Sequence, residues 1–191
     1  MTKAADSPKG RLIILSGPSG VGKGTVLNLL LSRNPQIFPS VSATTRQPRD
    51  GERDGVNYYF LSREEFEAKI AKGDMLEYAS YNGNYYGTPA DKVQEKLDAG
   101  MDVLLEIEVQ GAQKVMSVRK DVISIFILPP SQEELERRLV GRKTEDEAAI
   151  RKRLEASAFE LSKAGLYQYQ IVNHTVEQAA SEIEAVLYGN S

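Results

Sequence analysis

The sequence predicts an α/β protein in which a parallel sheet carries helices on both faces. Three short apolar runs, RLIILSG (11–17), DVLLEIEV (102–109) and VISIFILPP (122–130), are typical of strands buried on both faces. Helical segments separate these runs, and strands that alternate with helices favour parallel pairing. The 191 residues, 41% hydrophobic and 27% charged, suit one such domain with small insertions.

The first third of the chain combines a strand, a helix and a long polar stretch. We expect residues 1–9 to be a short flexible tail, because they lack the apolar stretch of a signal peptide. A helix is predicted over 22–33, and Asn34-Pro35 ends it. Residues 38–55 are polar and rich in turn formers, so we expect mostly loop there. VNYYFLS (56–62) alternates as a half-exposed strand does.

The region that follows predicts a small mixed α+β insertion. Ser62 and Glu65 form a capping-box pattern that starts a helix. DMLEYASYNGNYYGT (74–88) predicts a hairpin that turns at Asn82-Gly83. TPADKVQEKLDAG (88–100) predicts a helix with Pro89 in its first turn and Gly100 as its stop. We therefore expect residues 40–89 to be inserted into a core formed by 10–39 and 90–188.

The last part of the chain returns to the core pattern. Helices are predicted over 131–142, where Ser131 is the cap, and over 145–165. YQYQIVN (167–173) predicts a final strand, and Thr175 caps a closing helix over 175–189. We assign no element to 110–121.

Composition excludes several classes of protein. The formal net charge of −3 gives no overall basic surface, which argues against nucleic acid as a partner. The absence of Cys excludes disulfides and thiolate metal sites and fits a reducing cytoplasm. No apolar run approaches the roughly 20 residues that span a bilayer, so we expect no membrane association.

The stretch SGPSGVGKGT (16–25) predicts a phosphate-binding loop. Gly17, Gly20 and Gly22 let successive N–H groups point inward, and with the helix N-terminus they form a cradle for anions. Lys23 adds a cation for the outer phosphates of a nucleoside triphosphate. An ordinary glycine-rich turn is the alternative, but a buried strand before the loop and a helix after it are the context that this motif requires.

The residue after Lys23 departs from the usual loop, where Ser or Thr ligates Mg²⁺. Gly24 stands there, and Thr25 follows one place later. We expect Thr25 to reach a metal through water or to cap the helix. Glu106 and Glu108 end a buried strand on one side of an extended chain and are candidates for the metal shell. The alternative is that both carboxylates are simply solvated.

The insertion carries candidates for a second phosphate site. Arg46 and Arg49 lie three residues apart across Pro48, and guanidinium groups match phosphate oxygens bidentately. Two solvated loop arginines are the alternative. The hydroxyl of Tyr58 or Tyr86 is expected to contact a monophosphate together with the two arginines. For Tyr59 and Tyr85 we expect a half-buried aromatic face instead.

The hairpin carries candidates for reading a base. Guanine presents two donors, N1–H and N2–H₂, and a carboxylate such as that of Glu77 accepts both. Adenine presents an acceptor at N1, which the carboxylate would repel. Ser42 and Thr88 are expected to donate to guanine O6 and N7.

SGPSGVGKGT, FPSVSATTRQPRDGE, GNYYGTP, LEIEVQGAQ, PPSQEELERRLVGR and RKRL occur in this order, and together they resemble bacterial guanylate kinases over about residues 10–188. The resemblance implies a P-loop three-layer core, a GMP-binding insertion and a helical lid at about 138–153. It also implies transfer of phosphate from ATP to GMP with Mg²⁺ as cofactor. The spacing around Lys23 is similar to nucleoside monophosphate kinases rather than to GTPases, and no N-K-x-D motif occurs.

The resemblance assigns roles residue by residue. The ATP site would comprise Gly17, Pro18, Ser19, Gly20, Val21, Gly22, Lys23, Gly24, Thr25 and, beside the adenine, Asn173. The GMP site would comprise Ser42, Arg46, Arg49, Tyr58, Glu77, Tyr86, Gly87, Thr88, Glu106 and Glu108. Catalytic charges would come from Lys23, Arg46, Arg138, Arg142 and Arg153. The metal would be held, through water, by Thr25 and Glu106.

Two positions depart from the family pattern. Lys143 stands in the lid where many members have Gly, which puts a hinge there in doubt. His174, the single His, replaces a common Asp, and we expect a surface residue. Rival functions are a kinase for another nucleoside monophosphate and a non-catalytic guanylate-kinase-like interaction module. The sequence leaves the oligomeric state open between a monomer and a homodimer.

Overall fold

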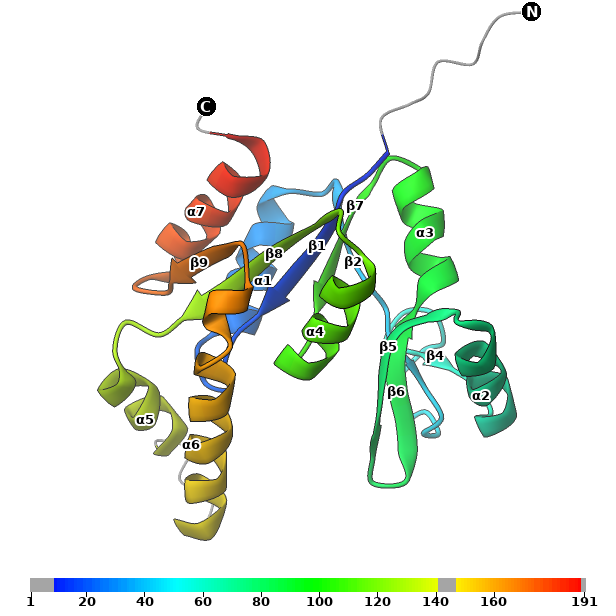
Figure 1. Ribbon diagram of the computed structural model, residues 1–191, viewed down its shortest axis with the longest axis horizontal. Coiled ribbons are helices and arrows are strands. Elements are labelled where there is room, and N and C mark those ends of the chain that lie inside the picture. Colours follow the sequence, from blue (N-terminus) through cyan, green and yellow to red (C-terminus); the bar gives the residue numbers. More distant parts are fainter. Residues whose placement is uncertain (1–8, 141–146, 190–191) are drawn as a thin grey trace, which may run out of the picture. The chain divides into compact units, whose positions relative to one another are not determined.

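A computed structural model of the chain describes residues 9–140 and 147–189, so residues 1–8 of the predicted tail lie outside them. Five strands hydrogen-bond in the order β2-β7-β1-β8-β9, and a second sheet has the order β4-β3-β6-β5 (Figure 1). β2 (Ile37–Pro39) and β7 (Asp102–Glu106) pair in parallel, as do β8 (Val122–Leu128) and β9 (Tyr169–Val172). This pairing between strands that are separated by helices confirms the predicted α/β class.

The chain divides into two compact units within which most contacts fall. One unit comprises Met1–Ile13, Gln36–Glu106 and Gln110–Val122; the other comprises Ile14–Pro35, Ile107–Val109 and Ile123–Ser191. Strand β1 (Leu12–Ser16) contributes residues to both. The predicted functional division into a core and an insertion over 40–89 is a different partition and stays a prediction.

The first unit contains the four-stranded sheet, formed by β3 (Ala43–Thr44), β4 (Tyr59–Phe60), β5 (Met75–Tyr81) and β6 (Asn84–Pro89). β5 and β6 form the predicted hairpin (Figure 1). It turns at Asn82 and Gly83, whose φ angles of 48° and 78° are both left-handed, as a tight two-residue turn requires.

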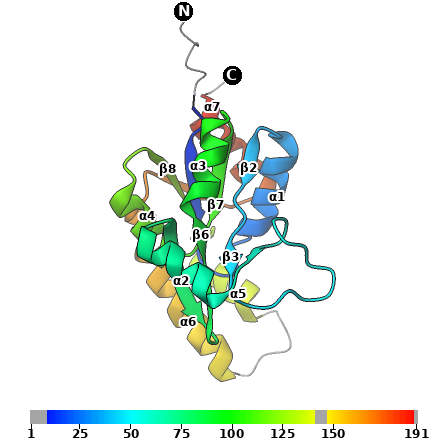
Figure 2. The ribbon, with the colours of Figure 1, turned by 90° about the vertical axis from the view of Figure 1, so that its right-hand side faces the viewer.

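Three helices accompany these strands. α2 (Arg63–Lys72) begins with the predicted capping box, because Ser62 and Glu65 each accept the backbone N–H of the other. α3 (Ala90–Asp98) lies alongside β7 (Figure 2). α4 (Val109–Val118), which follows β7, falls in the stretch to which we assigned no element.

The second unit is built from β8, β9 and four α-helices. α1 (Lys23–Arg33) packs against α7 (Val176–Tyr188), and each buries one apolar stripe (Figure 1). α5 (Gln132–Val140) and α6 (Glu147–Leu161) lie side by side, followed by the short 3₁₀ helix Ala164–Leu166. Ser131 and Thr175 cap α5 and α7 as predicted. No helix in the described part of the chain has the length and apolar run needed to cross a bilayer.

Several predicted elements differ from the structure at their limits. The strand predicted over 56–62 shrinks to the two residues of β4, and the predicted loop contains β3 and the end of β2. β7 ends at Glu106, so Glu108 lies beyond the strand that was expected to carry it. Pro89 is the last residue of β6 and the N-cap of α3 rather than part of its first turn.

An ion pair joins Arg11 to Asp102 at the start of β7. Arg11 Nη2 lies 2.6 Å from Asp102 Oδ2, and the Arg11 backbone N–H donates to Oδ1 at 2.8 Å. Burial raises the pKa of Asp102, but the hydrogen bonds from Arg11 outweigh it, so that the pKa lies below its ordinary value. The ionised carboxylate therefore contributes to folding stability at neutral pH.

We expect Asp102→Asn to lower the free energy of unfolding by about 1–3 kcal/mol at pH 7, because a charged acceptor is removed from a part-buried pair. Since the folded-state pKa of Asp102 is depressed, this stability is present above the unfolded pKa of about 3.9 and is lost as pH falls through the folded pKa. Urea unfolding at pH 7 and near pH 3 measures it, with the exposed Asp50→Asn as control. A difference that does not shrink in acid would contradict the assignment.

Candidate functional site

The phosphate loop connects β1 to α1 in a conformation that two glycines make possible. Gly20 and Gly22 have φ angles of 83° and 90°, which other residues rarely adopt. Gly22 is the N-cap of α1, so the N–H groups of Lys23 and Gly24 lie in a first turn that offers them no acceptor within the helix. Lys23 Nζ donates to the carbonyl oxygen of Gly17 at 3.2 Å. The arrangement forms the anion cradle that the sequence predicts.

Side chains from distant segments hold the loop from outside. Asn173 Nδ2 donates to the Val21 carbonyl oxygen at 2.8 Å, and Arg138 Nη1 donates to the same oxygen at 3.3 Å. Asn173 is only 3% exposed, so its amide is committed to this contact. A Cβ at Gly22 would come within 2.8 Å of Asn173 Nδ2. Close packing and backbone conformation therefore both require Gly22.

Arg138 is itself oriented by α5. Its Nε donates to Glu134 Oε1 at 2.7 Å, and Arg137 contributes two further hydrogen bonds to the same carboxylate. Hydrogen bonds from Arg137 and then Arg138 lower the pKa of Glu134 to about 2. Glu134 therefore stays ionised throughout the neutral range and keeps both guanidinium groups in place.

Helix α6 contacts the loop at Ser19. Arg153 Nη2 donates to Ser19 Oγ at 3.2 Å, which brings two of the predicted residues together. The Ser19 backbone N–H donates to Glu160 Oε2 at 3.3 Å, and Glu160 was not predicted. Arg142 and Lys143 lie outside the described residues.

We expect Asn173→Ala to weaken ATP binding by about tenfold, because the Val21 carbonyl loses a buried amide donor. This hydrogen bond, at 2.8 Å, is shorter than those that Arg138, Arg153 and Glu160 make to the loop. Calorimetric titration of ATP measures the loss. The neighbouring His174→Ala is the control, since His174 is exposed, as predicted. An unchanged ATP affinity in Asn173→Ala would show that the loop keeps its shape without this contact.

The residues expected near a metal are exposed. Thr25 lies in the first turn of α1, and Glu106 and Glu108 end and follow β7 with exposed side chains. The described residues contain no group of three or more His, Asp or Glu that could hold a metal by itself. Such a sparse donor set fits Mg²⁺ that is bound mainly by nucleotide phosphates and water, with one or two protein ligands.

Five of the predicted GMP residues lie on one face of the four-stranded sheet: Ser42, Tyr58, Glu77, Tyr86 and Thr88. Gly87 alternates to the other face, and Glu106 and Glu108 belong to β7 and the segment after it. Glu77 lies directly opposite Thr88, and Thr44 lies opposite Tyr86. Because directly opposed residues share a face and alternate residues along a strand do too, Tyr86 and Thr88 point the same way. The register between β3 and β4 adds Ser42 and Tyr58 to this face. Tyr59 and Tyr85 belong to the other face, where Tyr85 stacks on Phe66 at 5.1 Å, in agreement with their predicted packing role.

Arg46 projects toward the aromatic part of this face. Its Cζ lies 5.4 Å from the Tyr58 ring centroid, and the Tyr58 and Tyr86 rings are 6.2 Å apart. Glu52 accepts hydrogen bonds from Nη1 and Nη2 of Arg46, both at 2.9 Å. It also accepts one from the backbone N–H of Arg49 at 2.8 Å. The hydrogen bonds from Arg46 and Arg49 lower the pKa of Glu52. Glu52 thus holds the guanidinium group of Arg46 and the backbone of Arg49.

Glu77 is positioned by a hydrogen bond and by a close helix. Thr88 Oγ1 donates to Glu77 Oε1 at 2.7 Å. A Cβ at Gly111 of α4 would come within 3.0 Å of Glu77 Oε2, so Gly111 leaves room for the carboxylate. Gly87 lies between Tyr86 and Thr88, where a Cβ would meet the Glu77 backbone oxygen at 2.5 Å. The strands therefore approach closely at the point where Glu77 and Thr88 meet.

Sequence reasoning missed Glu52, Glu160 and Gly111. Glu52 had a signal, because RQPRDGE places a carboxylate between turn residues directly after the two arginines. Glu160 and Gly111 had none, since their partners lie 141 and 34 positions away along the chain.

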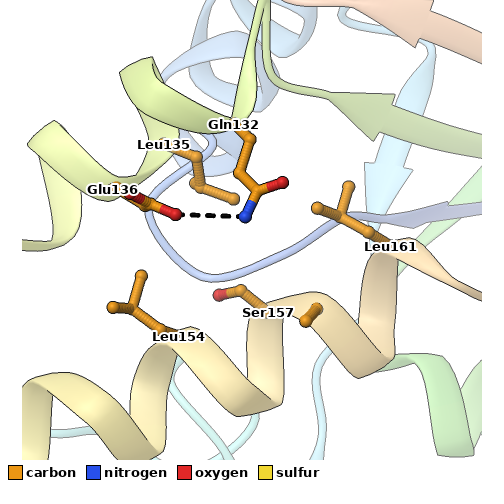
Figure 3. A pocket seen from close by; sticks show the side chains of 7 residues that line it. Gln132, Leu135, Glu136, Leu154, Ser157 and Leu161 are labelled. Atoms are coloured by element: carbon orange, nitrogen blue, oxygen red, sulfur yellow. Dashed lines mark hydrogen bonds between the residues drawn. The ribbon is translucent and has the colours of Figure 1, made fainter.

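A cavity of about 200 Å³ lies between α5 and α6 and is separate from these residues (Figure 3). Its lining residues are Gln132, Leu135, Glu136, Leu154, Ser157, Ala158 and Leu161. Ser157 Oγ is buried and has no hydrogen-bond partner among the described residues. None of the predicted site residues lines this cavity.

Comparisons with known proteins agree with this description. The model of the protein family described as guanylate kinase matches residues 9–189. A guanylate kinase of Shouchella clausii is 53% identical over 94% of this chain and 87% of its own length. One from a Synechococcus strain is 52% identical over 94% of this chain and 83% of its own length. The crystal structure of guanylate kinase from Anaplasma phagocytophilum matches with a TM-score of 0.69 and 41% identity, covering 94% of this chain and 85% of that one.

Proposed function

The chain belongs to the guanylate kinase family, and from this premise we propose how its residues transfer the γ-phosphate of ATP to GMP, giving ADP and GDP. ATP is the co-substrate, and the loop over residues 17–25 binds its phosphates. GMP binds on the sheet face that carries Glu77 and Thr88. The rival reading as a non-catalytic interaction module is not favoured, because Lys23 and the loop glycines are all retained.

The observation that carries the GMP assignment is the pairing of Glu77 with Thr88. The Glu77 carboxylate accepts from N1–H and N2–H₂ of guanine, while Ser42 and Thr88 donate to its O6 and N7. Thr88 has one hydroxyl proton, so its hydrogen bond turns from Glu77 to the base when GMP binds. Arg46, Arg49, Tyr58 and Tyr86 hold the monophosphate. An adenine base would present its N1 acceptor to the carboxylate, so AMP is excluded by repulsion.

Transfer requires positioning and charge neutralisation more than acid–base chemistry. A GMP phosphate oxygen attacks the γ-phosphorus in line, and no general base is needed. Lys23, with Arg138, Arg142 and Arg153, spreads the negative charge of the transition state, while Arg46 holds the attacking phosphate. Asn173 supports the loop, and contact with the adenine is its second proposed role.

Mg²⁺ neutralises the ATP phosphates when it is bound. Thr25 and Glu106 are the residues proposed to hold it, each through water, and Glu108 extends the acidic shell. Beyond its chain neighbours and the backbone of α1, no described atom lies within 4 Å of a Cβ built at Gly24, so packing does not prevent a hydroxyl there. Gly24 has no hydroxyl to offer, and Thr25 is the next residue that has one. We further propose a cytoplasmic location and no nucleic-acid partner.

An acceptor panel tests this function. AMP, GMP, dGMP, UMP and TMP are each offered with ATP and Mg²⁺, and ADP release is followed in a coupled assay. We expect GMP to give the highest kcat/KM, with AMP at least 10²-fold lower, because a hydrogen-bonding site rejects a base with the wrong donors. Faster turnover of AMP or UMP than of GMP would overturn the assignment of Glu77.

A further inference from the structure

We propose that Glu160 is a positioning residue for the phosphate loop, which it holds from helix α6 through the backbone N–H of Ser19. The proposal rests on the proposed function in one respect: it takes this loop to bind the phosphates of ATP. Glu160 itself touches no reacting atoms; it meets the predicted ATP site at the backbone N–H of Ser19, so its effect passes through the loop.

The first support is the geometry at Ser19. Glu160 Oε2 accepts the Ser19 N–H at 3.3 Å, while Arg153 Nη2 donates to Ser19 Oγ at 3.2 Å. Glu160 and Arg153 are seven residues apart on α6, which places them two turns apart on one face of the helix. Ser19 is exposed, and these two contacts tie its backbone N–H and its hydroxyl to α6.

The second support is that Ser19 lies outside the first turn of α1, whose N–H groups face an anion. The N–H groups that face an anion at a helix N-terminus are those of the first turn, here Lys23 and Gly24. Ser19 precedes them by four residues and sits where the chain leaves β1. A carboxylate bonded at Ser19 therefore acts on the part of the loop that precedes the first turn of α1.

The third support is the electrostatic cost of keeping a carboxylate there. Burial raises the pKa of Glu160, and the Glu108 carboxylate raises it further, while the Ser19 N–H and the Lys23 ammonium lower it. Since the folded-state pKa is raised, the ionised form at neutral pH weakens folding rather than supporting it. An ionised side chain that lowers the stability of the folded state is typical of a functional site.

The test compares four variants: Glu160→Ala, Glu160→Met, Glu160→Gln and, as control, Glu155→Ala. Glu155 is an exposed carboxylate on the same helix. Met fills the half-buried space without an acceptor and serves where Ala does not fold. The readouts are calorimetric ADP affinity, kcat/KM for ATP, KM for GMP and the unfolding temperature.

We expect loss of the acceptor in the Ala and Met variants to weaken ADP binding and to lower kcat/KM for ATP by about tenfold, as for loss of a hydrogen bond to a charged group. KM for GMP should stay within about twofold of wild type, because changes at sites that share no partners have independent effects. Gln should recover most of the loss, because its amide oxygen also accepts the Ser19 N–H. Gln should also unfold at the same or a higher temperature than wild type.

Two results would overturn the proposal: ADP affinity in the Ala and Met variants equal to or tighter than wild type, or a Gln variant as impaired as Met. Tighter binding would mean that the carboxylate opposes phosphate instead of ordering the loop. A wild-type protein that releases no ADP with GMP would refute the proposed function alone, because ADP affinity still reports the effect of Glu160.

Discussion

Replacing Lys23 with Ala is expected to lower kcat by about 10²-fold or more, since each 1.36 kcal/mol of lost transition-state stabilisation is about tenfold. Lys23 begins α1, and its ammonium donates to the Gly17 carbonyl oxygen at 3.2 Å. That oxygen belongs to the loop, so the ammonium is already held at the cradle where charge will develop. The loop backbone survives in the variant, and ground-state affinity for ATP should therefore fall less than turnover.

Steady-state kinetics with GMP at saturation measure this effect, together with ATP affinity by calorimetry. Lys72→Ala, an exposed lysine at the end of α2, is the control for removing a positive charge. Turnover of the Lys23 variant within a few fold of wild type would defeat the assignment of the loop as the ATP phosphate site.

Replacing Glu77 with Gln is expected to raise KM for GMP by about 10²-fold or more while KM for ATP stays nearly unchanged. Gln has the same shape, and its amide oxygen can keep the hydrogen bond from Thr88. Its NH₂ group then faces the guanine donors, so one hydrogen bond becomes a repulsive contact and a buried donor loses its partner. The loss is specific to the base, since neither the loop nor its contacts change.

Separate calorimetric titrations of GMP and ATP distinguish this from general damage. Glu64→Gln, an exposed position in the first turn of α2, is the matched control. Equal losses for both nucleotides would count against base recognition by Glu77. A gain in AMP turnover by the variant would strengthen the assignment, since the carboxylate is what repels adenine N1.

Elements that carry their own local signals could be predicted from the sequence. The loop after β1, the capping box of α2 and the Asn82-Gly83 turn each depend on residues within a few positions of one another. β3 is different, because its two residues form a strand by pairing with β4 and with Tyr86 and Gly87, which lie more than forty positions away. α4 was missed because Gly111 weakens a helical pattern, and its reason to be Gly is a distant carboxylate.

In the candidate site, too, residues with a local signal could be predicted and residues that depend on distant contacts could not. Glu77, Thr88, Tyr58 and Tyr86 could be named from residue types and from the family resemblance, and register then brought them to one face. Glu52, which holds Arg46, had a local signal in RQPRDGE that was missed, whereas Glu160 acts at Ser19 through a contact that only the folded chain creates. Residues that contact the substrate are thus easier to predict from a sequence than the residues that position them.

The amide of Asn173 bonded to Val21 has a consequence for biosynthesis. Asn173 lies 152 positions after Val21, so a ribosome makes the glycine-rich segment well before the residue that bonds to it. A nascent chain that ends short of Asn173 lacks this contact. We therefore expect it, like Asn173→Ala, to bind ATP more weakly than the folded protein.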